Sequence, residues 1–159
     1  MNVRPHRYAA TLRWTGFAPG EPMTYAGYSR EYVVEIAGKP PLRGSADAHF
    51  RGDAALHNPE DMLVAALSAC HLLSYLAECA RAGITVIAYE DDAQGEMTLI
   101  DGKIRFREVM LHPRVTIADA SRADEAMHLH EKAHAECFIA NSVNFPVRHD
   151  AVVAAAQPA

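Results

Sequence analysis

The chain has 159 residues, of which 50% are hydrophobic and 22% charged, and this composition is ordinary for a globular protein with a single core. Its net charge of −5 gives no electrostatic reason to expect a nucleic acid or an anionic membrane as a partner. Nucleic-acid binding and membrane-surface binding are therefore not the functions that composition favours.

No targeting or membrane segment is expected. Polar residues interrupt the longest apolar run, namely Ser68, Cys70, His71, Ser74 and Glu78. Residues 1–7 lack the apolar stretch of a secretory signal. We therefore expect a cytoplasmic protein with no membrane partner, whose three cysteines are catalytic, metal-binding or inert rather than a structural disulfide framework.

The first third of the chain is predicted to consist of strands and loops. Apolar residues alternate with more polar ones over 8–14 and again over 32–36, which predicts two strands. Three glycines and two prolines make 16–27 a loop. The polar stretch 42–57 is interpreted as a long connection with a role of its own, because structureless loops of this length are uncommon.

A long helix is predicted to follow. Asn58 is a good N-cap, Pro59 suits the first helical position, and Glu60 with Asp61 complements the positive end of the helix dipole. Gly83 is the expected stop. The middle of this helix is apolar on nearly every face, so we expect it to be central and buried between other elements, including a second copy of the chain.

The rest of the chain is predicted to alternate strands with one more helix. The expected elements are strands over 84–89, 104–111 (after a turn at Asp101-Gly102), 115–117 and 143–147, and a helix over 121–137 capped by Ser121. This order predicts an α+β fold with a mainly antiparallel sheet, as one domain over 1–150 with a disordered tail over 151–159.

Only two of the three cysteines are placed to meet. Cys79 follows Cys70 by nine residues, roughly 13 Å of helical rise and half a rotation, so these two cannot be bridged and Cys79 is interpreted as structural. Cys70 and Cys137 lie on different helices and can approach each other. For each of them the alternative is a small buried hydrophobe.

A reactive Cys70 needs a cation to stabilise its thiolate. A mid-helix position gains nothing from the helix N-terminus, and His71 points about 100° away from Cys70. Arginines of the preceding segment are better candidates, namely Arg30, Arg43 and Arg51. Glu60 lies ten residues, roughly 15 Å, before Cys70 on a straight helix. If both residues serve one site, either the helix breaks or Glu60 reaches the Cys70 of a second subunit, which favours a homodimer.

Two separated motifs resemble one known family. The run Asn58-Pro59-Glu60-Asp61-Met62-Leu63, followed by Ala65-Ala66-Leu67-Ser68-Ala69-Cys70, is similar to the helix start and peroxidatic-cysteine segment of the OsmC/Ohr thiol peroxidases. The later Ala133-His134-Ala135-Glu136-Cys137 is similar to the second-cysteine segment of that family. The resemblance covers nearly the whole chain and implies an OsmC-like α+β fold in an intertwined homodimer, with active sites at the subunit interface.

The resemblance also implies an activity and roles for four residues. The implied reaction is the reduction of organic hydroperoxides in oxidative stress defence, without a cofactor, and with a dithiol of the lipoyl type as reductant. Cys70 would be the peroxidatic thiol, Cys137 the resolving thiol and Glu60 the site carboxylate. The Arg-Asp-Gly pattern of the Ohr branch is absent, and Arg30 is chosen as the site arginine by its distance before Glu60. The chain therefore resembles a divergent, OsmC-like branch.

Two other classes of function stay open. Residues 130–134, His-Glu-Lys-Ala-His, match the helical zinc-protease pattern, and a zinc site using His134, Cys137 and Cys70 is an alternative to redox chemistry. The second open class is a non-catalytic protein that binds a small hydrophobic ligand. An apolar rim is predicted near the thiols, from Leu67, Leu73, Phe138 and Ile139.

Overall fold

A computed structural model describes residues 4–20 and 22–156. The sequence predicts one domain over 1–150, whereas the backbone contacts divide the chain into two compact units, 1–62 and 63–159. Each unit is described by itself below.

The first unit is a small antiparallel sheet with a short helical turn. Its strands are β1 (Thr11–Trp14), β2 (Tyr32–Glu35) and β3 (Leu42–Gly44), paired in the order β1-β2-β3. The 3-10 turn η1 (Ala48–Phe50) follows. The stretch 42–57 is therefore not a structureless connection, because it contains β3 and η1.

Helix α1 (Pro59–Ala82) begins and ends where its sequence predicts. The side chain of Asn58 accepts a hydrogen bond from the Asp61 amide at 2.7 Å, which is the predicted N-cap. Gly83 adopts a φ of 71° and the Ile84 amide then donates to the Cys79 carbonyl at 2.8 Å. The left-handed conformation of Gly83 lets the following backbone amides bind the last carbonyls of the helix, and glycine adopts it without steric strain because it has no side chain.

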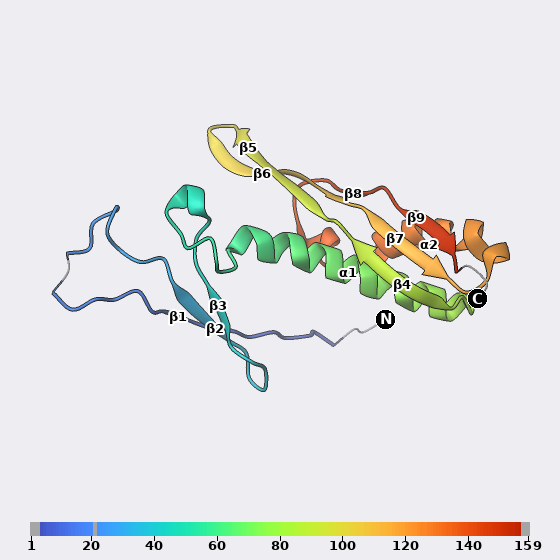
Figure 1. Cartoon of the computed structure of the whole chain (residues 1–159), viewed down its shortest axis with the longest axis horizontal. Coiled ribbons are helices and arrows are strands. Elements are labelled where there is room, and N and C mark those ends of the chain that lie inside the picture. The colour runs from blue at the N-terminus through green and yellow to red at the C-terminus, as the bar shows by residue number, and fades with distance from the viewer. Residues whose placement is uncertain (1–3, 21, 157–159) are drawn as a thin grey trace. The chain divides into compact units, whose positions relative to one another are not determined.

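The second unit has two three-stranded sheets. One sheet has the order β4 (Val86–Asp91), β7 (Pro113–Ile117), β9 (Val152–Ala155), and the other β5 (Gln94–Ile100), β6 (Lys103–Leu111), β8 (Val147–His149). The β4–β7 and β5–β6 pairs are antiparallel, and the β7–β9 and β6–β8 pairs are parallel. β5 and β6 form a long hairpin that Figure 1 shows, closed at Asp101 and Gly102, both with positive φ, as the predicted turn requires.

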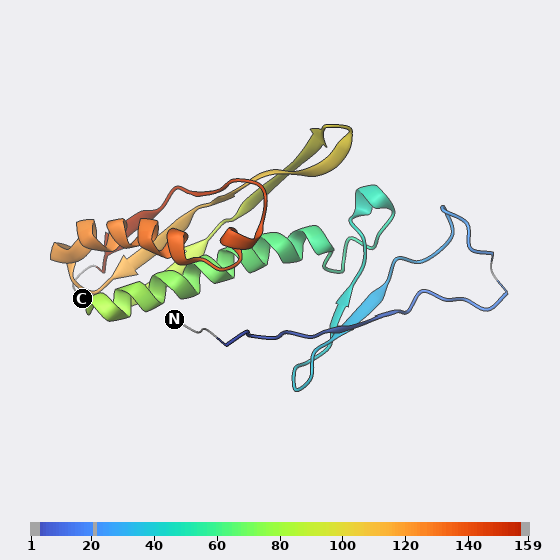
Figure 2. The same ribbon diagram turned by 180° about the vertical axis from the view of Figure 1, so that it is seen from behind.

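Helix α2 (Ala123–Glu136) lies beside α1 (Figure 2), between the 3-10 turns η2 (Ala120–Arg122) and η3 (Ala140–Ser142). The Tyr75 hydroxyl of α1 donates to the Ala126 carbonyl of α2 at 3.1 Å. Ser121 does not cap α2 as predicted. The Asp119 side chain caps η2 by accepting from the Ser121 amide, and α2 then continues from that turn.

Two core clusters hold the second unit together, and α1 contributes to both. One contains Tyr75, Cys79, Ile84, Val115, Ile117, Ala126 and Ala133. The other contains Leu67, Val109, Leu111 and Val147. The predicted α+β fold with two main helices and mainly antiparallel pairing is therefore confirmed, and α1 is its central helix.

Two predictions about the C-terminal segment were wrong. Val152–Ala155 is not a disordered tail but strand β9, because its two Val and two Ala residues pair in parallel with β7. Residues 157–159 of the predicted tail lie outside the described residues. The last predicted strand, 143–147, begins later, since β8 spans Val147–His149.

Within one chain, α1 buries a single face. Its buried residues are Leu67, His71, Tyr75, Glu78 and Cys79, whereas Leu73 is 66% exposed. By length and composition alone α1 is also a candidate membrane span, so the expectation that its polar residues exclude this was wrong. Its buried Glu78 and His71 instead contact side chains of α2, as in the core helix of a globular domain.

Candidate functional site

The second unit brings the two predicted thiols together. Cys70 lies in the middle of α1, and Cys137 is the residue at which α2 ends. The Cys70 thiol is close enough to Cys137 to contribute to the rise in the pKa of Cys137, and both cysteines are free. The Ile139 amide, just after Cys137, donates to the Cys70 sulfur at 3.5 Å. The fold therefore brings the two thiols, which are distant in sequence, into the same neighbourhood.

The two sulfurs have different surroundings. Cys137 is buried, and this burial, followed by the neighbouring Cys70 thiol, raises its pKa to about 11. The backbone amides of Ala140 and Ile139 oppose part of that rise. Cys70 is half-buried and opens onto a pocket. Cys137 is thus a protonated thiol at neutral pH, and Cys70 is the sulfur that a substrate can reach.

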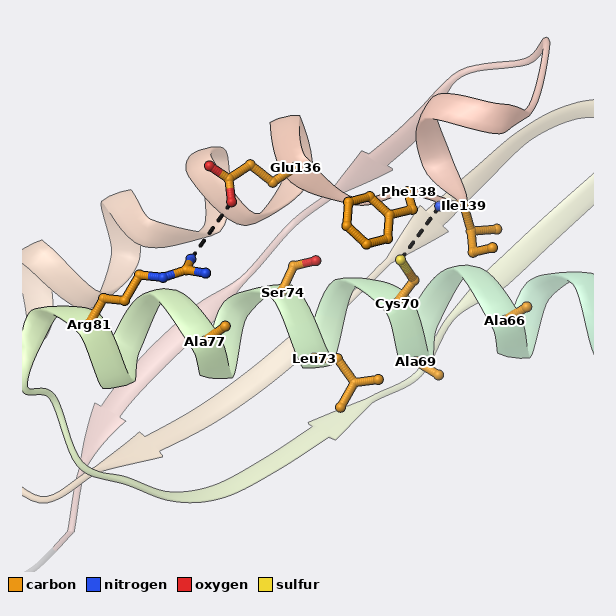
Figure 3. A pocket seen from close by; sticks show the side chains of 10 residues that line it. All are labelled: Ala66, Ala69, Cys70, Leu73, Ser74, Ala77, Arg81, Glu136, Phe138 and Ile139. Atoms are coloured by element: carbon orange, nitrogen blue, oxygen red, sulfur yellow. Dashed lines mark hydrogen bonds and ion pairs between the residues drawn. The ribbon is translucent and has the colours of Figure 1, made fainter. Parts of the chain in front are cut away.

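A pocket of about 470 Å³ runs along α1 beside Cys70 (Figure 3). It is lined by Ala66, Ala69, Cys70, Leu73, Ser74, Ala77, Arg81, Glu136, Phe138 and Ile139. Three residues of the predicted apolar rim line it, while Leu67 is fully buried in the core instead. Phe138 is 81% exposed and contributes its ring to the mouth. The pocket is therefore mostly apolar, with the thiol near one end and an arginine at the other.

A histidine cluster lies inside the fold, on the other face of α1. His71 is fully buried, and its Nε2 is 3.0 Å from Nδ1 of the equally buried His130. His134 and His149 complete the cluster, with ring centroids 5.3–6.5 Å from that of His71. Burial, followed by neighbouring histidines, lowers the pKa of His71 to about 4 and that of His130 to about 3. His71 therefore points into the core, and it does not supply a cation to Cys70.

A buried carboxylate ties the two helices together near the pocket. Glu78 of α1 forms ion pairs with Arg81 of the same helix and with Lys132 of α2. The hydrogen bond from Lys132 is the largest of the contacts that lower the pKa of Glu78. The side chain of Arg81 is thereby held at the end of the pocket.

Arg30 and Glu60 line one pocket of the first unit, of about 390 Å³. The guanidinium of Arg30 donates to the carbonyls of Tyr28 and Tyr25, both at 2.5 Å, and lies 3.9 Å from the Tyr28 ring centroid. Among the described residues no ion pair joins Arg30 to Glu60. Of the other candidate arginines, Arg43 pairs with Glu31 at 3.1 Å. The roles of Arg30 and Glu60 stay predictions.

Sequence reasoning missed two polar residues that line these pockets. Tyr32 lines the same pocket as Arg30 and Glu60, and its hydroxyl is buried without a partner. Burial, and then the charge of Glu60, raises the pKa of Tyr32. The other residue is Arg81, whose spacing of eleven residues from Cys70 on one helix was the available signal.

The zinc pattern at 130–134 does not form a metalloprotease site. Nδ1 of His130 already contacts Nε2 of His71. The Glu131 carboxylate lies 3.5 Å from Nε2 of His149. Among residues 4–20 and 22–156, no group of three or more His, Cys, Asp or Glu side chains is arranged to hold a metal ion. The third cysteine, Cys79, lies in the core, where burial raises its pKa.

Comparison with known proteins adds an independent result. Residues 52–151 match the family described as OsmC-like protein. An OsmC-like protein of unknown function from Vibrio cholerae has a similar structure, with a TM-score of 0.85, 31% identity, and coverage of 92% of this chain and 99% of that one.

Two more distant structures share the fold. One is an organic hydroperoxide resistance protein from Legionella pneumophila, with 19% identity, a TM-score of 0.70 and coverage of 95% of this chain and 98% of that one. The other is the organic hydroperoxide resistance protein OhrB of Bacillus subtilis, with 17% identity, a TM-score of 0.62 and coverage of 92% and 98%. An uncharacterized protein from Bacillus subtilis is 26% identical over 89 residues, which span 54% of this chain and 59% of that protein.

Proposed function

Because the chain belongs to the OsmC-like family, we propose that it is a thiol-dependent peroxidase that reduces organic hydroperoxides. The observation that carries the proposal is that Cys70 lines a pocket while the buried Cys137 thiol lies next to it. Names of structural relatives as organic hydroperoxide resistance proteins support the same chemistry.

In the first step, the Cys70 thiolate attacks the distal oxygen of the hydroperoxide. The O–O bond breaks, its electrons leave with the proximal oxygen, and that alkoxide takes up a proton to give the alcohol. Cys70 becomes a sulfenic acid, so sulfur is oxidised by two electrons while the peroxide is reduced by two. The Ile139 amide, 3.5 Å from the sulfur, favours negative charge there.

In the second step, Cys137 attacks the sulfenic sulfur. An S–S bond forms, the S–O bond breaks, and the hydroxyl leaves as water with the proton that Cys137 gives up. An external dithiol, of which the lipoyl type is one example, then reduces the disulfide by exchange and becomes a disulfide itself. Because the pKa of Cys137 is about 11, only a small fraction of it is thiolate at neutral pH, and loss of its proton is part of this step.

Arg30 and Glu60 complete the site in a homodimer in this proposal. α1 is continuous from Pro59 to Ala82, so a break that brings Glu60 to the Cys70 of its own chain is absent. Arg30 and Glu60 of one copy would instead act on the thiols of a second copy. Arg30 would then favour the partner's thiolate and donate to the peroxide, while Glu60 orients the guanidinium. The open face of α1, with Leu73 66% exposed, is available to such a partner.

The proposal predicts a preference among peroxides. The apolar lining of the pocket favours an organic group over water, so cumene hydroperoxide should be consumed with a kcat/KM at least about tenfold above that for hydrogen peroxide. Dithiothreitol serves as reductant and peroxide loss is measured directly. Equal efficiency with the two peroxides would contradict the role of the pocket.

Failure to consume any hydroperoxide would favour the alternative, a non-catalytic protein that binds a small hydrophobic ligand in the same pocket.

A further inference from the structure

One hydroxyl group of the first unit is buried without a hydrogen-bond partner. It belongs to Tyr32, the first residue of β2, which lines the same pocket as Arg30 and Glu60. The phenolic oxygen is shielded from solvent, and among the described residues no group forms a hydrogen bond with it. Burying a polar group without a partner destabilises a fold, so a hydroxyl in this position needs an explanation.

The backbone of β3 fixes the position of this hydroxyl. Tyr32 pairs with Gly44 across β2 and β3, and its ring lies over that glycine. A Cβ atom added to Gly44 would lie 2.4 Å from Cζ of Tyr32 and 2.5 Å from its hydroxyl oxygen, closer than side-chain packing allows. The phenol therefore rests directly against the backbone of β3, and a partner for its hydroxyl has to move toward it.

Glu60 is the acceptor that this pocket offers. The other carboxylate in the lining, Asp47, already contacts the amide and the ring Nδ1 of His49, each at 2.7 Å. Glu60 is half-buried in the first turn of α1, and within residues 4–20 and 22–156 its carboxylate forms no ion pair. Its charge, after the larger effect of burial, raises the pKa of Tyr32, so the phenol is protonated at neutral pH. A protonated phenol is a donor, and an ionised carboxylate only accepts.

Arg30 does not compete with Tyr32 for this carboxylate within one chain. Its two terminal nitrogens donate to the carbonyls of Tyr28 and Tyr25, and its guanidinium lies over the Tyr28 ring. Arg30 and Tyr32 are two residues apart at the start of a strand, so their side chains point to the same side. Because a carboxylate has two oxygens, one that binds Tyr32 can still present the other to Arg30.

We propose that the Tyr32 hydroxyl donates a hydrogen bond to the Glu60 carboxylate and holds it in the orientation that serves Arg30. Rotation of the flexible Glu60 side chain toward the fixed phenol closes this contact. Tyr32 is then a positioning residue, which acts through Glu60 and touches neither the peroxide nor the thiols. This inference rests on the proposed function, because the role of Glu60 comes from there.

A double-mutant cycle tests whether Tyr32 acts through Glu60. Tyr32→Phe removes only the hydroxyl and should lower kcat/KM for cumene hydroperoxide about tenfold, the loss expected for one hydrogen bond to a charged group. In the Glu60→Ala background the same substitution should cost less than about twofold, because the acceptor is already absent. Equal losses in the two backgrounds, or no loss in either, would overturn the proposal.

Tyr89→Phe is the matched control for the loss of a buried hydroxyl. The Tyr89 hydroxyl also lacks a partner among the described residues, but Tyr89 lies on β4, packs against the core of the second unit and lines neither pocket. Its replacement should leave kcat/KM unchanged in both backgrounds, and the thermal unfolding midpoint of each variant checks the fold. If Tyr32→Phe gives the same results as Tyr89→Phe, the proposal is wrong.

A measurement without peroxide separates this inference from the proposed function. In protein isotopically labelled at the Cζ atoms of tyrosine, the NMR signal of Tyr32 is the one that Tyr32→Phe removes. Glu60→Ala should move this signal upfield, because the phenol loses its carboxylate acceptor, while the Tyr89 signal stays in place. An unchanged Tyr32 signal overturns the contact even if peroxide is consumed. The expected shift in a protein that consumes no hydroperoxide supports the contact and contradicts the proposed function.

Discussion

Replacing Cys70 with serine is expected to lower dithiol-dependent consumption of cumene hydroperoxide on the order of a thousandfold or more, to the background rate, because the hydroxyl is a far weaker nucleophile than a thiolate. Serine is close in size to cysteine and Cys70 is half-buried, so the fold should be preserved. The measurement is peroxide loss under saturating dithiothreitol, with the thermal unfolding midpoint as a check on folding.

Cys79→Ala is the matched control for this change. Cys79 is on the same helix, but it is buried in the core and does not line the pocket. Its replacement should cost stability by leaving a small cavity, while kcat/KM stays within about twofold. An unchanged rate in Cys70→Ser would remove Cys70 from the mechanism, and a comparable loss in both variants would point to general damage of the fold.

Stability is expected to fall steeply as pH decreases below about 6.5. His71 and His130 are neutral in the folded state, with pKa values of about 4 and about 3, whereas an unfolded histidine has a pKa of about 6.5. The unfolded chain therefore binds more protons, so the contribution of these residues is complete above pH 6.5 and is lost as pH falls toward 4 and 3. For His71 alone the difference corresponds to roughly 3 kcal/mol, a large part of the stability of a typical domain.

The surroundings of the cluster do not offset this effect. Tyr75 stacks on His130 with ring centroids 3.8 Å apart and brings no charge that would favour an imidazolium. Glu131 and Asp150 favour the charged form of His149, yet burial outweighs them and lowers its pKa as well. Protonation would place positive charges side by side in the buried space between α1 and α2.

Urea unfolding at pH 7.5 and pH 5 measures this dependence. His130→Gln keeps a partner for His71 and removes one titrating ring, so it should flatten the loss between these two pH values. His128→Gln is the control, because His128 is exposed on the same helix and its Nδ1 hydrogen-bonds to the Asp124 carbonyl of that helix. Equal stability of the wild type at both pH values would show that the cluster is not held neutral by the fold.

Local signals in the sequence were sufficient for α1 and its ends. Asn58 and Gly83 act through backbone groups within a few residues of themselves, so their effects are visible without the tertiary structure. The Asp101-Gly102 turn was predictable for the same reason. Helix geometry showed only that Cys70 and Cys137 can approach each other, and their roles as a redox pair came from the resemblance to a family, since no local rule brings together residues that are 67 positions apart.

The features that were missed depend on contacts between distant segments. Val152–Ala155 becomes a strand because β7 offers it an open edge, which its own composition does not reveal. The four histidines of the cluster come from α1, α2 and β8, and no local pattern in the sequence brings these three elements together. Arg81 was missed as a pocket residue because that pocket forms between α1 and the segment after α2.

Mass spectrometry after one equivalent of cumene hydroperoxide, without reductant, tests the central claim most directly. The account predicts that the protein loses two hydrogens and that digestion yields a peptide in which Cys70 is joined to Cys137, while Cys79 keeps a free thiol. Intact Cys70 and Cys137 thiols after complete consumption of the peroxide, or a lasting Cys70 sulfenic acid with Cys137 unlinked, would contradict it.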